Sequence, residues 1–200
     1  MILAVFAQDE QWDEIKKDVI NVEWIRLTSL IDIPENIAGL FILSDFFEID
    51  YTATQAPIFI NSVTNTLMEL NTPANVVRIN GWNGFLARTE WEISGIISEK
   101  VSGVLNSLQK KITILPDEPG FISARILAMI VNEAWFALGE NVSTIKEIDI
   151  AMKLGTNYPL GPFEWGEKIG EKRIFDLLQK LTEKNKKYLP APLLKQKITE

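Results

Sequence analysis

The sequence predicts two unlike halves, an α/β domain over residues 1–116 followed by an all-helical domain over residues 117–200. Short β-rich runs recur as far as Pro116, and segments with helical spacing separate some of them. From Gly120 onward the strand pattern stops and long helical patterns replace it. Because strands that alternate with helices are typical of an α/β layer fold, we expect a parallel sheet confined to the first half.

Several of the predicted strands are continuous apolar runs and not alternating ones. Such runs are typical of strands that are buried on both faces of a parallel sheet. We place these strands at Met1–Ala7, Asn21–Ser29, Gly39–Phe46, Ala56–Val63, Asn75–Asn80, Arg88–Ser94 and Lys111–Pro116.

Helical spacing appears twice among these strands. Trp12, Ile15 and Val19 follow the acidic pair at residues 9–10, as apolar residues on one face of a helix would. A second helix is predicted by similar spacing at Ile97, Val101, Val104, Leu105 and Leu108.

The second half predicts a helical domain. Residues 121–140 are apolar nearly all round, as expected of a helix buried in a bundle or a subunit interface, and Gly139 is placed to close it. Thr144, with Glu147 three residues later, predicts a capped helix start. Residues 158–170 are interpreted as a turn. The stripe that predicts the last main helix consists of Ile174, Leu177, Leu178 and Leu181.

Composition excludes several classes of function. The net charge of −7 over 200 residues argues against nucleic acid as a partner, because phosphate binding needs clustered Lys and Arg. The absence of Cys and His removes disulfides, the usual metal ligands and every Ser-His-Asp triad, so no metal site is expected. No apolar run approaches about 18 residues, so we expect no membrane span and a cytoplasmic location.

Residues 117–165 resemble the start of the helical domain of the 3-hydroxyacyl-CoA dehydrogenases. The resemblance is long and keeps the order of the family's motifs. It rests on the runs Pro119–Ile122, Asn132–Ala134, Ile148–Asp149, Ala151–Gly155 and Pro159–Phe163, with Arg125 between the first two and a later match at Leu189–Ile198.

The same resemblance assigns candidate site residues in the first half. The family's catalytic histidine lies twelve residues before a glutamate that holds it, and counting back from Glu92 gives Asn80. On that register Asn83 matches a family asparagine and Gly84 replaces a proline. Ser62 falls at the family's substrate-contacting serine, and the family's other substrate-site asparagine falls on Ala124.

The resemblance implies a shortened Rossmann-like sheet domain, NAD as cofactor, an acyl-CoA-like ligand and a homodimer formed through the helical domain. The family's reaction is the NAD-dependent oxidation of 3-hydroxyacyl-CoA to 3-ketoacyl-CoA. An asparagine amide cannot take up the hydroxyl proton near neutral pH. With Asn80 in place of the histidine, we therefore expect the oxidation of 3-hydroxyacyl-CoA to be impaired or absent. Glu92 is then either a substitute base or a remnant of the lost pair.

The cofactor loop departs from the family as well. A dinucleotide fold needs a glycine-rich turn after the first strand, whereas here "QDEQWDE" follows and the first glycine is Gly39. Carboxylates at that position would repel a pyrophosphate. Glu23, on the second strand, is either a ribose contact or a solvated side chain. About ten residues (30–39) replace the helical arm that covers the substrate in the family.

Two hypotheses follow from these departures. The first is a working oxidoreductase of this family with a divergent mode of cofactor binding. The second is a non-catalytic protein that binds an acyl-CoA-like ligand or acts as a dimerisation or partner module, with the region 121–138 as the dimer contact.

Overall fold

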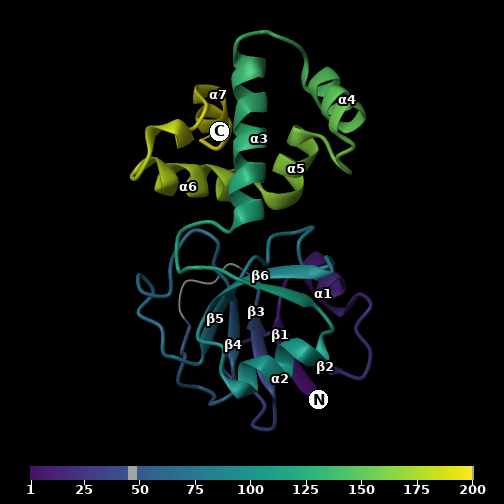
Figure 1. Cartoon of the computed structure of the whole chain (residues 1–200), viewed down its shortest axis with the longest axis vertical. Coiled ribbons are helices and arrows are strands. Elements are labelled where there is room, and N and C mark those ends of the chain that lie inside the picture. Colours follow the sequence, from purple (N-terminus) through teal and green to yellow (C-terminus); the bar gives the residue numbers. More distant parts are fainter. Residues whose placement is uncertain (45–48, 200) are drawn as a thin grey trace. The chain divides into compact units, whose positions relative to one another are not determined.

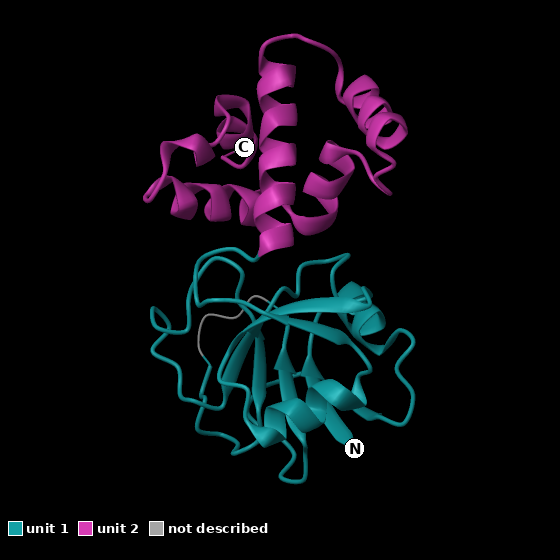
Figure 2. Cartoon of the chain, viewed as in Figure 1, with its two compact units in different colours: residues 1–121 teal, residues 122–200 magenta. Residues whose placement is uncertain are grey.

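A computed structural model describes residues 1–44 and 49–199, so the last two residues of the predicted strand Gly39–Phe46 lie outside the described residues. The chain forms two compact units, a first unit of residues 1–121 and a helical unit of residues 122–200 (Figure 2). The boundary that we placed after Pro116 lies shortly before this division.

Seven strands of the described chain form one sheet in the order β2-β1-β3-β4-β5-β6-β7. All neighbouring pairs are parallel except β5 and β6, which run antiparallel. The prediction of a parallel sheet is therefore correct for β1 to β5, whereas β6 and β7, parallel to each other, run opposite to those five strands. Residues 80–89 join β5 to β6 without a helix, and so short a link returns the chain in the opposite direction. The strands are β1 (Ile2–Phe6), β2 (Glu23–Arg26), β3 (Gly39–Ile42), β4 (Ile58–Asn61), β5 (Val76–Ile79), β6 (Glu90–Gly95) and β7 (Lys111–Ile114).

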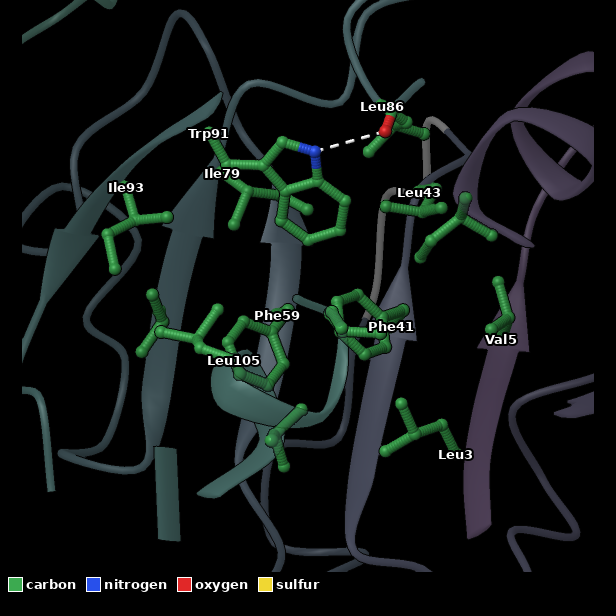
Figure 3. Close-up of a cluster of buried hydrophobic side chains, with 14 of the residues drawn as sticks. Leu3, Val5, Phe41, Leu43, Phe59, Ile79, Leu86, Trp91, Ile93 and Leu105 are labelled. Atoms are coloured by element: carbon green, nitrogen blue, oxygen red, sulfur yellow. Dashed lines mark hydrogen bonds between the residues drawn. The ribbon is translucent and has the colours of Figure 1, made fainter. Parts of the chain in front are cut away.

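Helices cover one face of the sheet. Ile15 of α1 (Asp9–Lys16) and Val101, Val104 and Leu105 of α2 (Glu99–Ser107) pack against that face. Figure 3 shows part of this core, in which Phe41 and Phe59 stack with ring centroids 4.5 Å apart. The two rings come from neighbouring strands, and a buried aromatic pair of this kind adds about 0.5–1.5 kcal/mol beyond its burial.

Loops cover the other face of the sheet. Leu40, Ile42, Ile58 and Ile60 point to this side and pack against residues of the connecting segments, among them Leu30, Ile33, Tyr51, Leu67 and Leu70. The links from β2 to β3, from β3 to β4 and from β4 to β5 contain no helix within their described residues. The first unit therefore keeps a Rossmann-like sheet and replaces the helices of its second face by irregular segments.

The helical unit is built around α3 (Ile122–Gly139), which packs against α5 (Pro162–Ile169), α6 (Glu171–Thr182) and α7 (Pro192–Lys197), while α4 (Ile145–Thr156) packs against α5 (Figure 1). Two buried polar residues order its connections. The carboxylate of Asp149 accepts a hydrogen bond from the backbone N–H of Phe163 at 2.8 Å and so caps α5. The amide of Asn132 donates to the Leu189 carbonyl at 3.0 Å and accepts from the Ala191 N–H at 2.8 Å, which holds the segment before α7.

The structure corrects two predictions for the helical unit. Residues 162–169, interpreted as part of a turn, form α5. Gly161 and Pro162 begin this helix instead of breaking the chain, because proline fits the first helical position. Gly139 is the last residue of α3, and the left-handed conformation that ends a helix is taken by Asn141, with φ of 57°.

Helix α3 also bears on the expectation that nothing spans a membrane. It is 18 residues long with a mean hydropathy of 1.3, which is enough by length and composition to cross one. The buried helix of a bundle satisfies the same criteria, and the α3 contacts with α5, α6 and α7 are those of such a helix.

Candidate functional site at the carboxyl end of the sheet

Asn80 and Glu92 face each other across β5 and β6. The register pairs Arg78 with Ser94 and Ile79 with Ile93, and the next step brings the Asn80 N–H within 3.3 Å of the Glu92 carbonyl. Directly opposite residues in an antiparallel pair project to the same face, so the two side chains are neighbours. The count of twelve residues therefore corresponds to a real pairing, with a buried amide opposite a half-buried carboxylate.

The turn after Asn80 is fastened to the start of α1. The Asn83 side-chain amide donates to the Glu10 carboxylate at 2.7 Å, and the Gly84 N–H donates to the Glu14 carboxylate at 2.6 Å. Glu10 and Glu14 are four residues apart and so lie on one face of α1. Gly84 has φ of 91°, a conformation that proline cannot adopt, so the turn differs in shape from a turn with the family's proline.

Gln11 completes the link between α1 and this edge of the sheet. Its side chain is fully buried, and its amide nitrogen donates to the carbonyls of Leu43 at 2.8 Å and Gly81 at 2.9 Å. The Gly81 N–H in turn donates to the Asn61 side chain at 3.0 Å. Sequence reasoning missed both Gln11 and Asn61. Gln11 is a polar residue between the acidic pair Asp9–Glu10 and Trp12, and nothing in that sequence indicates that it is buried.

These residues do not fit the pyrophosphate of a dinucleotide. Such a group lies against backbone N–H groups at the start of the first helix, next to a glycine-rich turn. Here Ala7 and Gln8 form the turn, the Gln8 N–H donates to the Gln11 side chain at 3.3 Å, and Asp9 and Glu10 place carboxylates in the first helical turn. An anion would meet two negative charges at this position.

The second strand also departs from a dinucleotide site. An acidic residue that contacts a ribose lies at the carboxyl end of this strand, whereas Glu23 is exposed at the opposite end of β2. The carboxyl end carries Arg26, which donates to the Ala7 carbonyl at 3.3 Å and to the Asp9 carboxylate at 2.5 Å. Of the two interpretations of Glu23, its position favours the solvated side chain.

Ser62 lies directly after β4, at the same edge of the sheet as Asn80. Its hydroxyl donates to the Asn65 carbonyl at 2.8 Å, and its own carbonyl accepts from Arg78 Nε at 2.8 Å. Ser62 thus follows β4, Asn80 follows β5, and Glu92 lies in β6, with Asn83 in the turn that joins β5 to β6.

Arg78 is the buried ion of this region. Its side chain is fully buried, and Nη1 lies 2.5 Å from the Asp117 carboxylate, while Nη2 donates to the carbonyls of Val63 and Glu118. Burial lowers the pKa of the guanidinium, and the hydrogen bond and charge of Asp117 oppose that shift. Asp117 also accepts the backbone N–H groups of residues 67 and 68, so one ion pair holds three segments together.

Comparisons with known proteins decide the family. A family model of the 3-hydroxyacyl-CoA dehydrogenase C-terminal domain matches residues 120–200. A 3-hydroxybutyryl-CoA dehydrogenase of Clostridioides difficile is 32% identical over 141 residues, covering 66% of this chain and 50% of that protein. An alignment of this length extends beyond the helical unit into the first unit. The helical unit belongs to the C-terminal domain family of the 3-hydroxyacyl-CoA dehydrogenases.

Two further comparisons show how much of the chain is similar to known proteins. The 3-hydroxyadipyl-CoA dehydrogenase of Escherichia coli is 42% identical over 90 residues, which are 44% of this chain and 19% of that protein. Among solved structures, M. tuberculosis FadB2 has a TM-score of 0.74 at 15% identity and covers 99% of this chain and 93% of its own. The chain thus shares the fold of FadB2 along its whole length, but its sequence matches span only 19% to 50% of the two curated relatives.

The family's helical motifs now have a physical reason in this chain. The Ile-Asp and Gly-Pro-Phe motifs meet where Asp149 caps α5, and a side chain at Gly161 would overlap the Asp149 carboxylate. Asn132 of the Asn-Glu-Ala motif holds the later Leu-Pro-Ala segment. Ala124, at the position of a family asparagine, is buried in α3 and has no polar side-chain atom to offer a substrate.

Proposed function

We propose that this chain is a family member that does not carry out NAD-dependent oxidation of 3-hydroxyacyl-CoA. The observation that carries the proposal is the contact between α1 and the turn at residues 81–84. Glu10, whose carboxylate is bound to that turn together with that of Glu14, lies in the first turn of α1, where a dinucleotide site presents free N–H groups. The residues of the site offer neither a place for the pyrophosphate nor a base at position 80.

The pair of Asn80 and Glu92 supports the same conclusion on the substrate side. A general base must be within hydrogen-bond reach of the proton it removes and must titrate near the working pH. The amide of Asn80 does not titrate, although it can donate a hydrogen bond to a carbonyl oxygen. What remains at this position is a set of polar groups suited to holding a ligand such as the thioester or keto group of an acyl-CoA.

The first test is an assay of 3-hydroxybutyryl-CoA oxidation with NAD, run beside the Clostridioides difficile relative as positive control. We expect a rate at least about 10²–10⁴-fold below that of the relative, the range lost when a general base is removed. A rate within tenfold of the relative would contradict the proposal. Glu92→Gln would then tell whether Glu92 is the substitute base, because only that role requires its carboxylate.

The ligand role is tested by calorimetric titration with NADH and with acetoacetyl-CoA, separately and together. We expect binding of the CoA ester without NADH, and no heat from NADH alone. Absence of binding for either compound would leave the helical unit, as a dimerisation or partner module, to carry the function.

We also propose that the chain forms a homodimer through the helical unit. The α3 residues Ile122 and Ile126 are more than half exposed, and on α4 Leu154 is 83% exposed. Among the described residues of α4 the side chain of Asp149 alone is buried, so this helix leaves most of its apolar surface uncovered. Apolar surface of this extent marks an interaction site in most proteins, and a second copy is the commonest partner.

Sedimentation velocity at micromolar concentration checks this prediction. We expect the wild-type chain to sediment as a dimer and Leu154→Glu to shift it to monomer, because a buried carboxylate would face apolar surface. Ile31→Glu is the matched control, since Ile31 is an isoleucine of the first unit that is 87% exposed. A wild-type monomer, or equal effects of the two substitutions, would count against the dimer.

A further inference from the structure

A pocket of about 480 Å³ lies in the first unit, away from the site described above. It is formed by the start of β5, the end of β6, the loop at residues 67–74 and the segment at residues 115–117. Asn80 follows the last residue of β5, whereas the pocket contacts its first residue, Val76. The two sites are therefore at opposite ends of the same strand, and 480 Å³ is within the usual range for a small-molecule pocket.

Ser94 lines this pocket with a hydroxyl group that has no hydrogen-bond partner among the described residues. The side chain is 1% exposed. Its cross-strand neighbour Arg78 lies on the same face of the sheet but directs its donors to Asp117 and to the carbonyls of residues 62, 63 and 118. A buried hydroxyl group without a hydrogen bond lowers the stability of the fold, and such groups are rare in native proteins. The Ser94 hydroxyl is therefore suited to bind a group supplied by a ligand.

Most of the remaining wall is apolar, and its polar side chains are those of Asn71, Thr72 and Asp117. Leu67, Val76 and Leu115 supply the apolar surface, and Met68 and Ile96, both largely exposed, extend it to the rim. Asp117 is the one charged residue in the described lining. Both of its oxygens are engaged, Oδ1 by Arg78 and the Leu67 N–H and Oδ2 by the Met68 N–H.

We propose that this pocket binds a small, uncharged and mainly apolar molecule whose single carbonyl or hydroxyl group bonds to the Ser94 hydroxyl. The apolar walls accept a short alkyl chain, and Ser94 can either donate to a carbonyl or accept from a hydroxyl. An ionised ligand is disfavoured because its charge would lose water without gaining an opposite charge. The proposal goes beyond the role of the Asn80 site and does not depend on it.

The test uses the full chain labelled with ¹³C at the methionine methyl groups and titrated with hexanamide. The chain has four methionines, and Met68 alone of them lines the pocket, so Met1, Met129 and Met152 serve as internal controls. We expect the Met68 signal to shift with a dissociation constant on the order of 1 mM, as a ligand of this size allows. Hexanoate, which has the same chain and a charged end, is expected to bind at least about tenfold more weakly.

Two substitutions separate this site from non-specific binding. Ser94→Ala removes the hydroxyl without changing the pocket's walls and is expected to weaken hexanamide binding about 5- to 10-fold while the protein stays folded. Ala74→Trp adds a ring at the rim and is expected to abolish the Met68 shift. Ala53→Trp, at an exposed alanine outside the pocket, is the matched control and is expected to leave binding unchanged.

The outcomes that overturn the proposal are equally defined. No shift of Met68 up to the solubility limit of hexanamide would mean that the pocket holds water only. Equal binding of hexanoate would contradict an uncharged ligand. Unchanged binding by the Ser94→Ala protein would remove the hydroxyl from the site.

Discussion

Replacing Arg78 by methionine is expected to destabilise the first unit by about 3–5 kcal/mol, the usual cost of removing one partner of a buried ion pair. The guanidinium is fully buried, and it bonds to the Asp117 carboxylate and to three backbone carbonyls. Methionine fills a similar volume but leaves all four acceptors without these donors. The loss is therefore electrostatic and not a matter of packing.

Urea unfolding of the full chain measures this effect, with hydrogen exchange to assign it to the first unit. Arg26→Met is the control, because Arg26 also lies 2.5 Å from a carboxylate, that of Asp9, but both side chains are exposed. We expect the control to cost less than about 1 kcal/mol. Equal losses in the two variants would show that burial of Arg78 adds nothing.

A double-mutant cycle tests whether Asp117 is the partner of Arg78 that contributes most to the free energy of unfolding. If the ion pair dominates, Arg78→Met should cost clearly less in an Asp117→Asn background than in the wild-type chain, because neighbouring groups in one network are not additive. Additive losses would mean that the backbone carbonyls, and not Asp117, account for the stability.

Most of the fold could be predicted because it follows from local patterns. Short β-rich runs, several of them continuously apolar, identified every strand of the sheet, and the Thr144–Glu147 pair marked the start of α4, where the capping box is present. The antiparallel direction of β6 was not predicted. The direction of this strand depends on the short connection at residues 80–89, and the apolar pattern of the strand carries no information about that connection.

The sequence predicted which residues of the candidate site pair across the sheet, but it did not predict what the surrounding side chains bind. A spacing of twelve residues placed Asn80 against Glu92, and the two do face each other. The contacts of Glu10 and Glu14 with the turn at residues 83–84 join residues more than 65 positions apart in sequence. Such contacts depend on how α1 is oriented against the sheet, so the sequence showed only that carboxylates were present and not what they bind.

The resemblance to the family gives the positions of site residues but not their contacts. It identifies the positions of Ser62, Asn80 and Asn83, but it cannot tell whether an altered residue has been given a new structural partner. Asn83 illustrates the point, because it is retained from the family and yet its side-chain amide is bound to Glu10. A retained residue is thus not evidence of retained chemistry unless its contacts are known.

Replacing Asp149 by alanine is expected to destabilise the helical unit by about 1.5–3 kcal/mol, the range for hydrogen bonds to charged groups. The carboxylate is buried and accepts the Phe163 N–H at the start of α5, where a negative charge also meets the positive end of the helix dipole. Unfolding in urea measures the loss, and faster hydrogen exchange over residues 162–169 would place it at α5. Asp176→Ala is the matched control, because Asp176 forms an exposed i, i+4 pair with Lys172 that is worth about 0.3–0.5 kcal/mol.

Gly161 provides the stricter version of this test. A side chain there would overlap the Asp149 carboxylate, so Gly161→Ala should be strongly destabilising in the wild-type chain. Asp149→Ala would keep the Asp149 Cβ, which also overlaps that position, so the background used is Asp149→Gly; there the space is free and the same substitution should cost much less. The φ of Gly161 is −72°, which is open to any residue, so the backbone does not require a glycine here. Equal harm from Gly161→Ala in both backgrounds would therefore contradict Asp149 as the reason for the glycine.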